Sequence, residues 1–242
     1  WSYIRSRKGV AGTLALFSLI AFNLSLIQVL ILPLVLSIGT RTDLGFIQSA
    51  GGAGILAGGA LMVVWKGPER KMLAILGAAL FMAAILSIIP LFTTVAIIAA
   101  GAFLIMFAAP VVNVSSKTLW QRKTDPAFQG RVFSLRNTVL GAAQPLAFLS
   151  AGWLADNYFE PMMAVGGSLA NIFGPVWGVG EGRGVALLMS ISGVASVILV
   201  SLSLMIPVMR RVDIDLPDYD MTFYSGGGNR GVALTHSEAG VA

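Results

Sequence analysis

Lys117–Arg136, KTLWQRKTDPAFQGRVFSLR, is the longest polar interruption in an otherwise strongly apolar sequence. It holds a single acid, Asp125, against five basic residues: Lys117, Arg122, Lys123, Arg131 and Arg136. Long uncharged runs flank it on both sides, as expected for a loop at one face of a membrane. Lys and Arg collect in cytoplasmic loops because such loops resist translocation, so we expect this stretch to lie in the cytoplasm.

The composition indicates an integral membrane protein. Of the 242 residues, 56% are hydrophobic and 11% are charged, whereas soluble domains carry about 25% charged residues. The net charge of +5 comes from basic residues at the ends of apolar runs. It therefore indicates topology signals and predicts no nucleic-acid partner. The sequence contains no cysteine, which excludes disulfides and thiolate chemistry.

Six spans of about 20 apolar residues account for the uncharged runs. The predicted spans are 9–37, 43–65, 72–90, 94–117, 132–155 and 184–209. Residues 1–8 form a basic cytoplasmic lead-in, and 211–242 form a flexible cytoplasmic tail rich in Asp, Gly and Ser. The start at Trp1 is expected of a fragment or a processed product. The six spans predict an all-α membrane protein. Loops rich in Lys and Arg alternate with loops that are poor in them, which predicts that both termini lie in the cytoplasm.

The insert 157–183 lies between the last two spans and is predicted to be external. Its uncharged part, Pro161–Gly180, is long enough for a seventh span but contains five glycines and two prolines. A Gly- and Pro-rich segment leaves backbone groups unpaired in lipid, so we expect an interfacial or partly re-entrant loop. A seventh crossing would also move the carboxyl end outside.

No Asp, Glu or His residue lies in the interior of a predicted span, and Asp43 stands at the outer end of the second. Such residues are the usual candidates for proton relays and for ion or haem ligation within a membrane. No nucleophile–base pair, metal-ligand cluster or phosphate loop is present either. We therefore expect no enzyme activity, no cofactor and no metal. His236 in the tail is interpreted as a solvated residue rather than a metal ligand or pH sensor.

Neutral polar side chains interrupt four of the spans. Gln28, Gln48, Asn113 and Gln144 lie in the first, second, fourth and fifth spans, and Phe148 follows Gln144 on one stripe. Amides in lipid need partners, so these faces are expected to point toward a bundle interior or a watery cavity. The alternative is that the amides only hydrogen-bond neighbouring helices.

Two glycines of the second span, Gly54 and Gly58, form a GxxxG pattern. Small residues at this spacing let two helix backbones approach closely, which favours helix packing over a gating hinge.

The order of these features resembles the carboxyl-terminal half of a major facilitator superfamily transporter. The closest similarity is to the macrolide-efflux and siderophore-export type of drug:proton antiporter. The resemblance rests on the basic lead-in Tyr3–Arg7, PAFQGRVFSLRN at 126–137, Ala155-Asp156, and the FEPMM and GVGEGRG segments of the insert. It covers residues 1 to 220.

The resemblance implies one half of a twelve-helix fold, built from inverted three-helix repeats around a central cavity. The cavity is lined by the first, second, fourth and fifth helices of each half, which places Gln28, Gln48, Asn113, Gln144 and Phe148 at the substrate path. Cytoplasmic loop residues expected to take part in gating are Lys66, Arg70, Lys71, Gly130 and Arg131. The Lys66–Lys71 loop departs from the family pattern in lacking its aspartate.

The expected function is export of an amphipathic organic solute from a bacterial inner membrane, by proton antiport. The expected partners are the lipid bilayer, that solute, and a missing amino-terminal half or a second copy. An importer of the same fold is an open alternative. The alternative from another class is a transporter-like scaffold or assembly subunit of a larger membrane complex.

Overall fold

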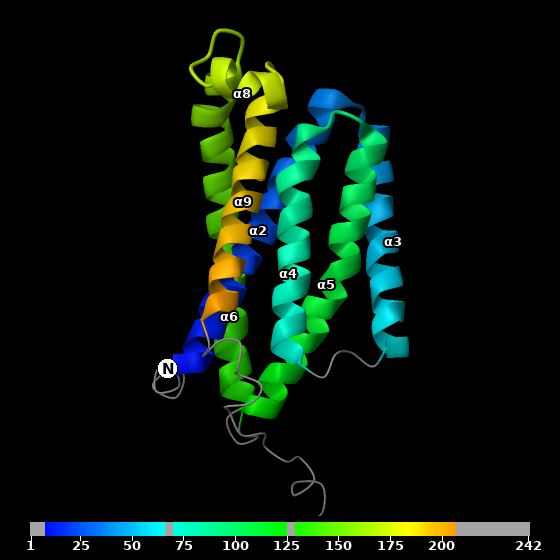
Figure 1. Ribbon diagram of the computed structural model, residues 1–242, viewed down its shortest axis with the longest axis vertical. Helices are drawn as coiled ribbons and strands as arrows, with labels where there is room; N and C mark the ends of the chain where they lie inside the picture. The colour runs from blue at the N-terminus through cyan, green and yellow to red at the C-terminus, as the bar shows by residue number, and fades with distance from the viewer. Residues whose placement is uncertain (1–7, 66–69, 125–128, 207–242) are drawn as a thin grey trace, which may run out of the picture.

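The computed structural model describes residues 8–65, 70–124 and 129–206. Within these ranges the chain is helical and contains no strand. Six helices of 18 or more residues dominate it (Figure 1). They are α2 (Lys8–Ile38), α3 (Arg41–Trp65), α4 (Lys71–Ile88), α5 (Val95–Lys123), α6 (Gln129–Leu154) and α9 (Arg183–Met205). All six contribute segments that are long and apolar enough to cross a membrane, as the sequence predicts.

The long uncharged run after Lys71 divides at Pro90. Helix α4 ends at Ile88, a 3₁₀ turn covers Ile89–Leu91, and α5 begins at Val95. Proline favours this break because it lacks the N–H that would continue the ladder. Pro33, Pro110 and Pro145, by contrast, lie inside helices.

Two helices are longer than the predicted spans. Helix α5 continues to Lys123, and α6 begins at Gln129. The expected loop Lys117–Arg136 is therefore helical over most of its length, which corrects the prediction. Helix α6 also continues through a π-helical turn (Ala155–Phe159) into α7 (Glu160–Met163). The predicted spans were ended where polar residues begin in the sequence. A helix can continue beyond the apolar layer, however, because its backbone hydrogen bonds do not depend on side-chain polarity.

Several predicted regions lie outside the described residues. They are the basic lead-in before Lys8, the residue Lys66, and the tail that contains His236.

The insert before α9 contains only short helices. After α7 it has one further helix, α8 (Ala170–Trp177), of eight residues. Eight residues extend about 12 Å, well short of a hydrocarbon core of roughly 30 Å. Figure 1 shows α8 at the end of the molecule where α9 begins.

The long helices pair in a regular pattern. Helix α3 packs on α5, and α2 packs on α6. Helix α4 packs on α5 and α9, and α9 also packs on α2. Exchanging α2, α3 and α4 for α5, α6 and α9, in that order, leaves these five pairs unchanged. A smaller contact between α2 and α3 has no counterpart of similar extent between α5 and α6.

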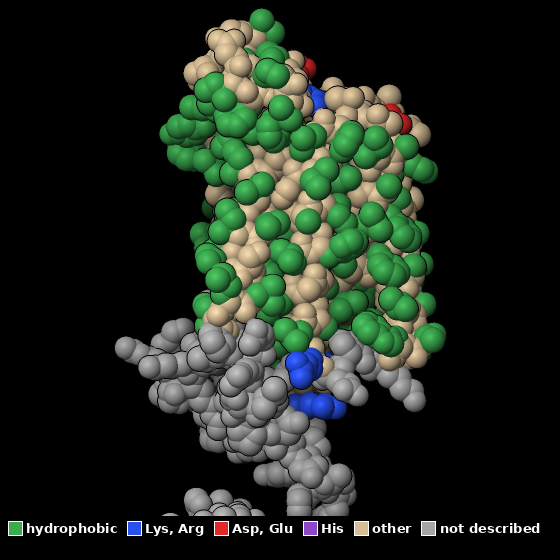
Figure 2. Space-filling model, viewed as in Figure 1, with side chains coloured by type: hydrophobic (Ala, Val, Ile, Leu, Met, Phe, Trp, Pro, Cys, Tyr) green, Lys and Arg blue, Asp and Glu red, His purple; other side chains and the backbone are tan. Residues whose placement is uncertain are grey.

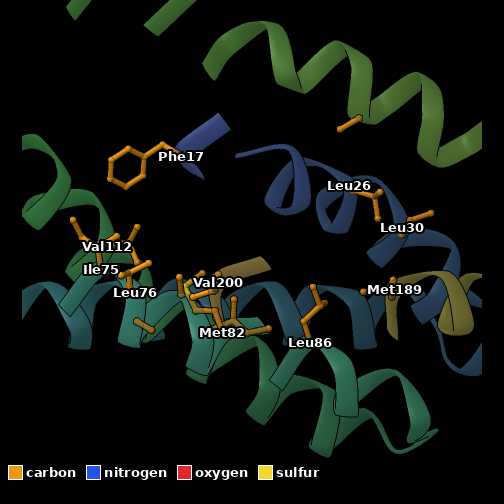
Figure 3. Packing of buried hydrophobic residues seen from close by; sticks show 14 of the residues in the cluster. Phe17, Leu26, Leu30, Ile75, Leu76, Met82, Leu86, Val112, Met189 and Val200 are labelled. Carbon is orange, nitrogen blue, oxygen red and sulfur yellow. The ribbon is translucent and has the colours of Figure 1, made fainter. Parts of the chain in front are cut away.

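Buried aliphatic side chains fill the space where these helices meet. Figure 3 shows Leu30 from α2, Leu76 and Met82 from α4, and Met189 and Val200 from α9 in one cluster. Leu30, Leu76 and Met189 are at most 3% exposed. Burial of a side chain of this size stabilises a fold by about 1.5–3 kcal/mol in water, whereas within lipid the gain comes from close packing.

Helices α3 and α5 approach each other very closely. A Cβ atom built on Gly54 or Gly58 would overlap the backbone of Phe103 or Phe107 on α5. The two glycines therefore form a packing surface, which is the interpretation that the GxxxG pattern favours. A second buried cluster lies between this pair of helices and α2, and consists of Val35, Ile47, Ile98 and Ala99.

Charged side chains lie at the two ends of the helices. Figure 2 shows only apolar and uncharged side chains between these ends on the visible face. One end, here called the basic end, carries Arg70, Lys71, Lys117, Arg122, Arg131 and Arg136. The opposite end carries all the acids of the described chain, Asp43, Asp156, Glu160 and Glu181, together with Arg41 and Arg183. This distribution and the six apolar helices indicate a multi-pass membrane protein.

Candidate functional site

The predicted substrate-path residues lie on the surface of the six-helix unit. Gln28, Gln48, Asn113, Gln144 and Phe148 are all exposed. None of the four amide side chains forms a hydrogen bond within the described residues. They therefore neither point into the interior of this unit nor tie its described helices together. Their positions leave them available to a cavity or to another chain.

The exposed amides are distributed unequally among the helices. They occur on α2, α3, α5 and α6, while α4 and α9 carry no Asn or Gln. On α6, Asn137, Gly141, Gln144 and Phe148 are all exposed at steps of three and four, so they share one face. The two helices without amides pack on each other.

The loop residues expected to take part in gating are not brought into a common site. Arg70, Gly130 and Arg131 are exposed and Lys71 is partly exposed. None of these residues forms an ion pair in the described part of the chain. What the four share is their place at the basic end.

The sequence places Arg136 only in the basic loop, whereas in the structure its side chain lies between three helices. Its guanidinium carbon lies 5.7 Å from the ring centre of Phe17 on α2 and 5.8 Å from that of Trp120 on α5. Its Nη2 donates to Ser116 Oγ at 2.8 Å, and its Nη1 donates to Asn137 Oδ1 at 3.4 Å. Both rings and Ser116 are buried. The apolar stretch that directly follows Arg136 could have indicated that Arg136 belongs to a helix and not to a loop.

Hydrogen bonding at this site is incomplete. Arg136 Nε and Trp120 Nε1 are buried and have no partner among the described residues. A third such atom, Ser115 Oγ, lies one residue before Ser116. An unsatisfied buried donor costs about 1–3 kcal/mol, so native folds seldom retain one without a reason.

A different polar cluster organises the opposite end. The Glu160 carboxylate accepts from the backbone N–H groups of Gly182 and Val185 at 3.2 and 2.9 Å. Buried Arg183 donates to the Trp177 carbonyl at 3.3 Å. Trp177 Nε1 in turn donates to the hydroxyl of a buried serine of α9, Ser190, at 3.0 Å. These bonds hold the insert onto the start of α9, so the cluster has a structural role.

An apolar groove of about 450 Å³ opens between α3 and α5. Its lining is Phe46, Ala50, Ala96, Ala99, Ala100, Phe103 and Leu104. No side chain of this lining can form a hydrogen bond, so the groove suits hydrocarbon.

The described residues contain no group of three His, Asp or Glu side chains placed to hold a metal ion.

No family model, curated protein or solved structure matches this chain. Its function is therefore inferred from the exposed amides, the basic end and the pairing of the helices.

Proposed function

We propose that this chain is one six-helix half of a secondary active transporter of the major facilitator type, which exports an amphipathic organic solute by proton antiport. The observation that carries the proposal is the set of exposed amides within four apolar helices. An amide facing lipid loses its hydrogen bonds with water and gains none in return. A water-filled cavity shared with a second six-helix unit would satisfy all of them.

The helix pairing supports this architecture. The five main pairs are unchanged when the first three long helices are exchanged for the last three, although the smaller α2–α3 contact has no counterpart of similar extent. Since three crossings reverse the direction of the chain, such a repeat would be inverted with respect to the membrane. An inverted three-helix repeat is the internal design of each half of a major facilitator fold.

The exposed surface of α2, α3, α5 and α6 would face the second unit, which is an amino-terminal half or a second copy. Phe148, 43% exposed beside Gln144, would contact the apolar part of the solute. The basic end would face the cytoplasm of a bacterial inner membrane, with both termini on that side. The arginines and lysines of the gating loops would close the cavity there.

Proton coupling requires a titratable group, and every acid of the described residues lies at the end opposite the basic end. The coupling carboxylate would therefore belong to the second unit. The exposed amides would contribute hydrogen bonds to the solute without changing charge during the cycle.

The test is transport by the native protein in proteoliposomes loaded with a fluorescent amphipathic dye, with an imposed pH gradient. Asn113→Leu and Gln144→Leu should each weaken solute affinity about threefold to tenfold, the value of one neutral hydrogen bond. Ile198→Leu on the amide-free helix α9 is the control and should leave transport unchanged. Absence of pH-driven dye flux in the unaltered protein would reject the proposal and favour a scaffold.

Melting temperature should be measured on the same preparations. A lower melting temperature with unchanged affinity in both amide variants would remove Asn113 and Gln144 from the substrate path.

A further inference from the structure

Arg136 is a partly buried cation that forms no ion pair within the described residues, and it is flanked by two aromatic rings and an unpaired indole N–H. We propose that Arg136, with Trp120 and Ser116, binds a single anionic group, a carboxylate or phosphate, carried by the transported solute. This inference rests on the proposed export function and narrows its substrate to amphipathic anions.

The donors of this site set the chemistry of its ligand. A guanidinium carries five N–H donors and no acceptor, and an indole carries one donor and no acceptor. Ser116 Oγ and Asn137 Oδ1 accept hydrogen bonds from two of the guanidinium N–H groups. The unpaired atoms, Arg136 Nε and Trp120 Nε1, are both donors. The complementary ligand is a group that only accepts, and a carboxylate or phosphate binds a guanidinium through two parallel hydrogen bonds.

The described charges around the site have one sign. The nearest described acid that follows Arg136 in the chain is Asp156, 20 residues further along the same continuous helix. At 1.5 Å per residue this separation is about 30 Å, so Asp156 is too distant to pair with the guanidinium. Lys117 adjoins Ser116 and is exposed, which adds a second positive charge. An incoming anion would therefore be attracted rather than repelled.

The surroundings explain why the preferred anion is amphipathic. The rings of Phe17 and Trp120 stand within 6 Å of the guanidinium carbon, and the core residues Val112 and Ile75 belong to the same cluster. Figure 3 shows Phe17 at one end of this cluster, projecting from α2. Arg136 is only partly buried, so part of it faces the surface. Phe133 and Leu140, three residues before and four after Arg136 on α6, are also only partly buried. The apolar portion of an anion bound there would lie against these two side chains.

The ligand is tested with a matched pair of probes, benzoate and its neutral isostere benzamide, added to the native protein in a neutral detergent. Ligand-observed NMR titration measures both affinities. Benzoate should bind at least about tenfold more tightly than benzamide, since only the anion pairs with the guanidinium charge. Equal affinities would overturn the inference, because the site would then not discriminate charge.

Three variants locate the binding. Arg136→Gln should weaken benzoate about tenfold or more and leave benzamide unchanged. Trp120→Phe keeps an aromatic ring, removes the N–H, and should weaken benzoate about threefold to tenfold. Arg122→Gln removes a charge from the same end at an exposed residue and should have no effect. An unchanged benzoate affinity in Arg136→Gln and Trp120→Phe would refute the assignment.

A carboxylate from another protein chain could occupy the same position. In that case benzoate would fail to bind the native protein, and the inference would be wrong. The two proposals fail differently. Charge-selective binding without pH-driven transport rejects export and leaves an anion site without a transported solute, while transport without charge-selective binding rejects the anion site alone.

Discussion

Glu160 joins two segments that are 22 to 25 residues apart in the chain. Its two carboxylate oxygens accept from Gly182 N–H and Val185 N–H at the first turn of α9. These are amides that a helix leaves unpaired at its start, and a negative charge there also interacts favourably with the helix dipole. Gly182 precedes α9 at φ 75°, a left-handed conformation that glycine adopts without strain.

Replacing Glu160 by alanine should destabilise the attachment of the insert. The variant loses both hydrogen bonds and the carboxylate charge that acts on Arg183, at a cost of about 1–3 kcal/mol. Thermal unfolding followed by the fluorescence of the tryptophans reports this change. Glu181→Ala is the control, at an exposed residue of the same segment whose side chain forms no hydrogen bond within the described residues. Equal melting temperatures for the two variants would contradict a capping role.

At the scale of the helices, glycine placement decides how closely a pair can approach. Helix α3 has glycines on two faces: Gly54 and Gly58 meet α5, whereas Gly52 and Gly59 meet nothing within 4 Å. The helix pair α4–α9 is held in a similar way, since a Cβ on a glycine of α9, Gly193, would lie 2.5 Å from the backbone nitrogen of a serine of α4.

Gly58→Ala and Gly59→Ala should have opposite effects, although the residues are adjacent. At Gly58 the added methyl collides with the Phe107 backbone and forces α3 away from α5, costing about 1–3 kcal/mol. At Gly59 the methyl enters open space and should stabilise the helix by about 0.5–1 kcal/mol. Melting temperatures of the two purified variants measure the difference. A destabilised Gly59→Ala would indicate that this face contacts another chain.

The π-helical turn Ala155–Phe159 shows another effect at the same scale. It lets α6 continue as a helix into α7, which contacts α9. A π-helical turn contains more residues than an α-helical turn, which changes the direction in which the following side chains point. The first residue after the turn is Glu160, which reaches the start of α9.

For the whole molecule, the orientation in the membrane is the property most open to a direct test. The sequence has no cysteine, so single cysteines can be introduced without background. Cysteines at Thr93 and Ser168 should react with an impermeant maleimide in intact cells, because basic loops stay in the cytoplasm and these positions lie at the other end. Cysteines at Gln121 and Gly130 should react only after permeabilisation. All four positions are exposed, and labelling of Gly130 from outside would reverse the proposed orientation.

Composition and length were enough to predict the helical class, the six apolar segments and the break near Pro90, because a bilayer demands about 20 apolar residues with internally paired backbones. The positions of the charges at the helix ends were equally predictable. These properties follow from each segment's own residues and do not depend on its neighbours. Only where a helix continues past its apolar part, as between Lys117 and Lys123, was the prediction wrong.

Which faces of the helices are covered depends on how the helices pack. The apolar pattern within a membrane helix is a weak guide to this, since lipid-facing and buried residues are both apolar. Packing therefore determined that the amides lie exposed and that α5 is the helix that Gly54 and Gly58 meet. It also brought Phe17, Trp120 and Arg136, which are far apart in the chain, to one place. Contacts of this kind depend on the arrangement of three helices, and no local pattern in the sequence encodes that arrangement.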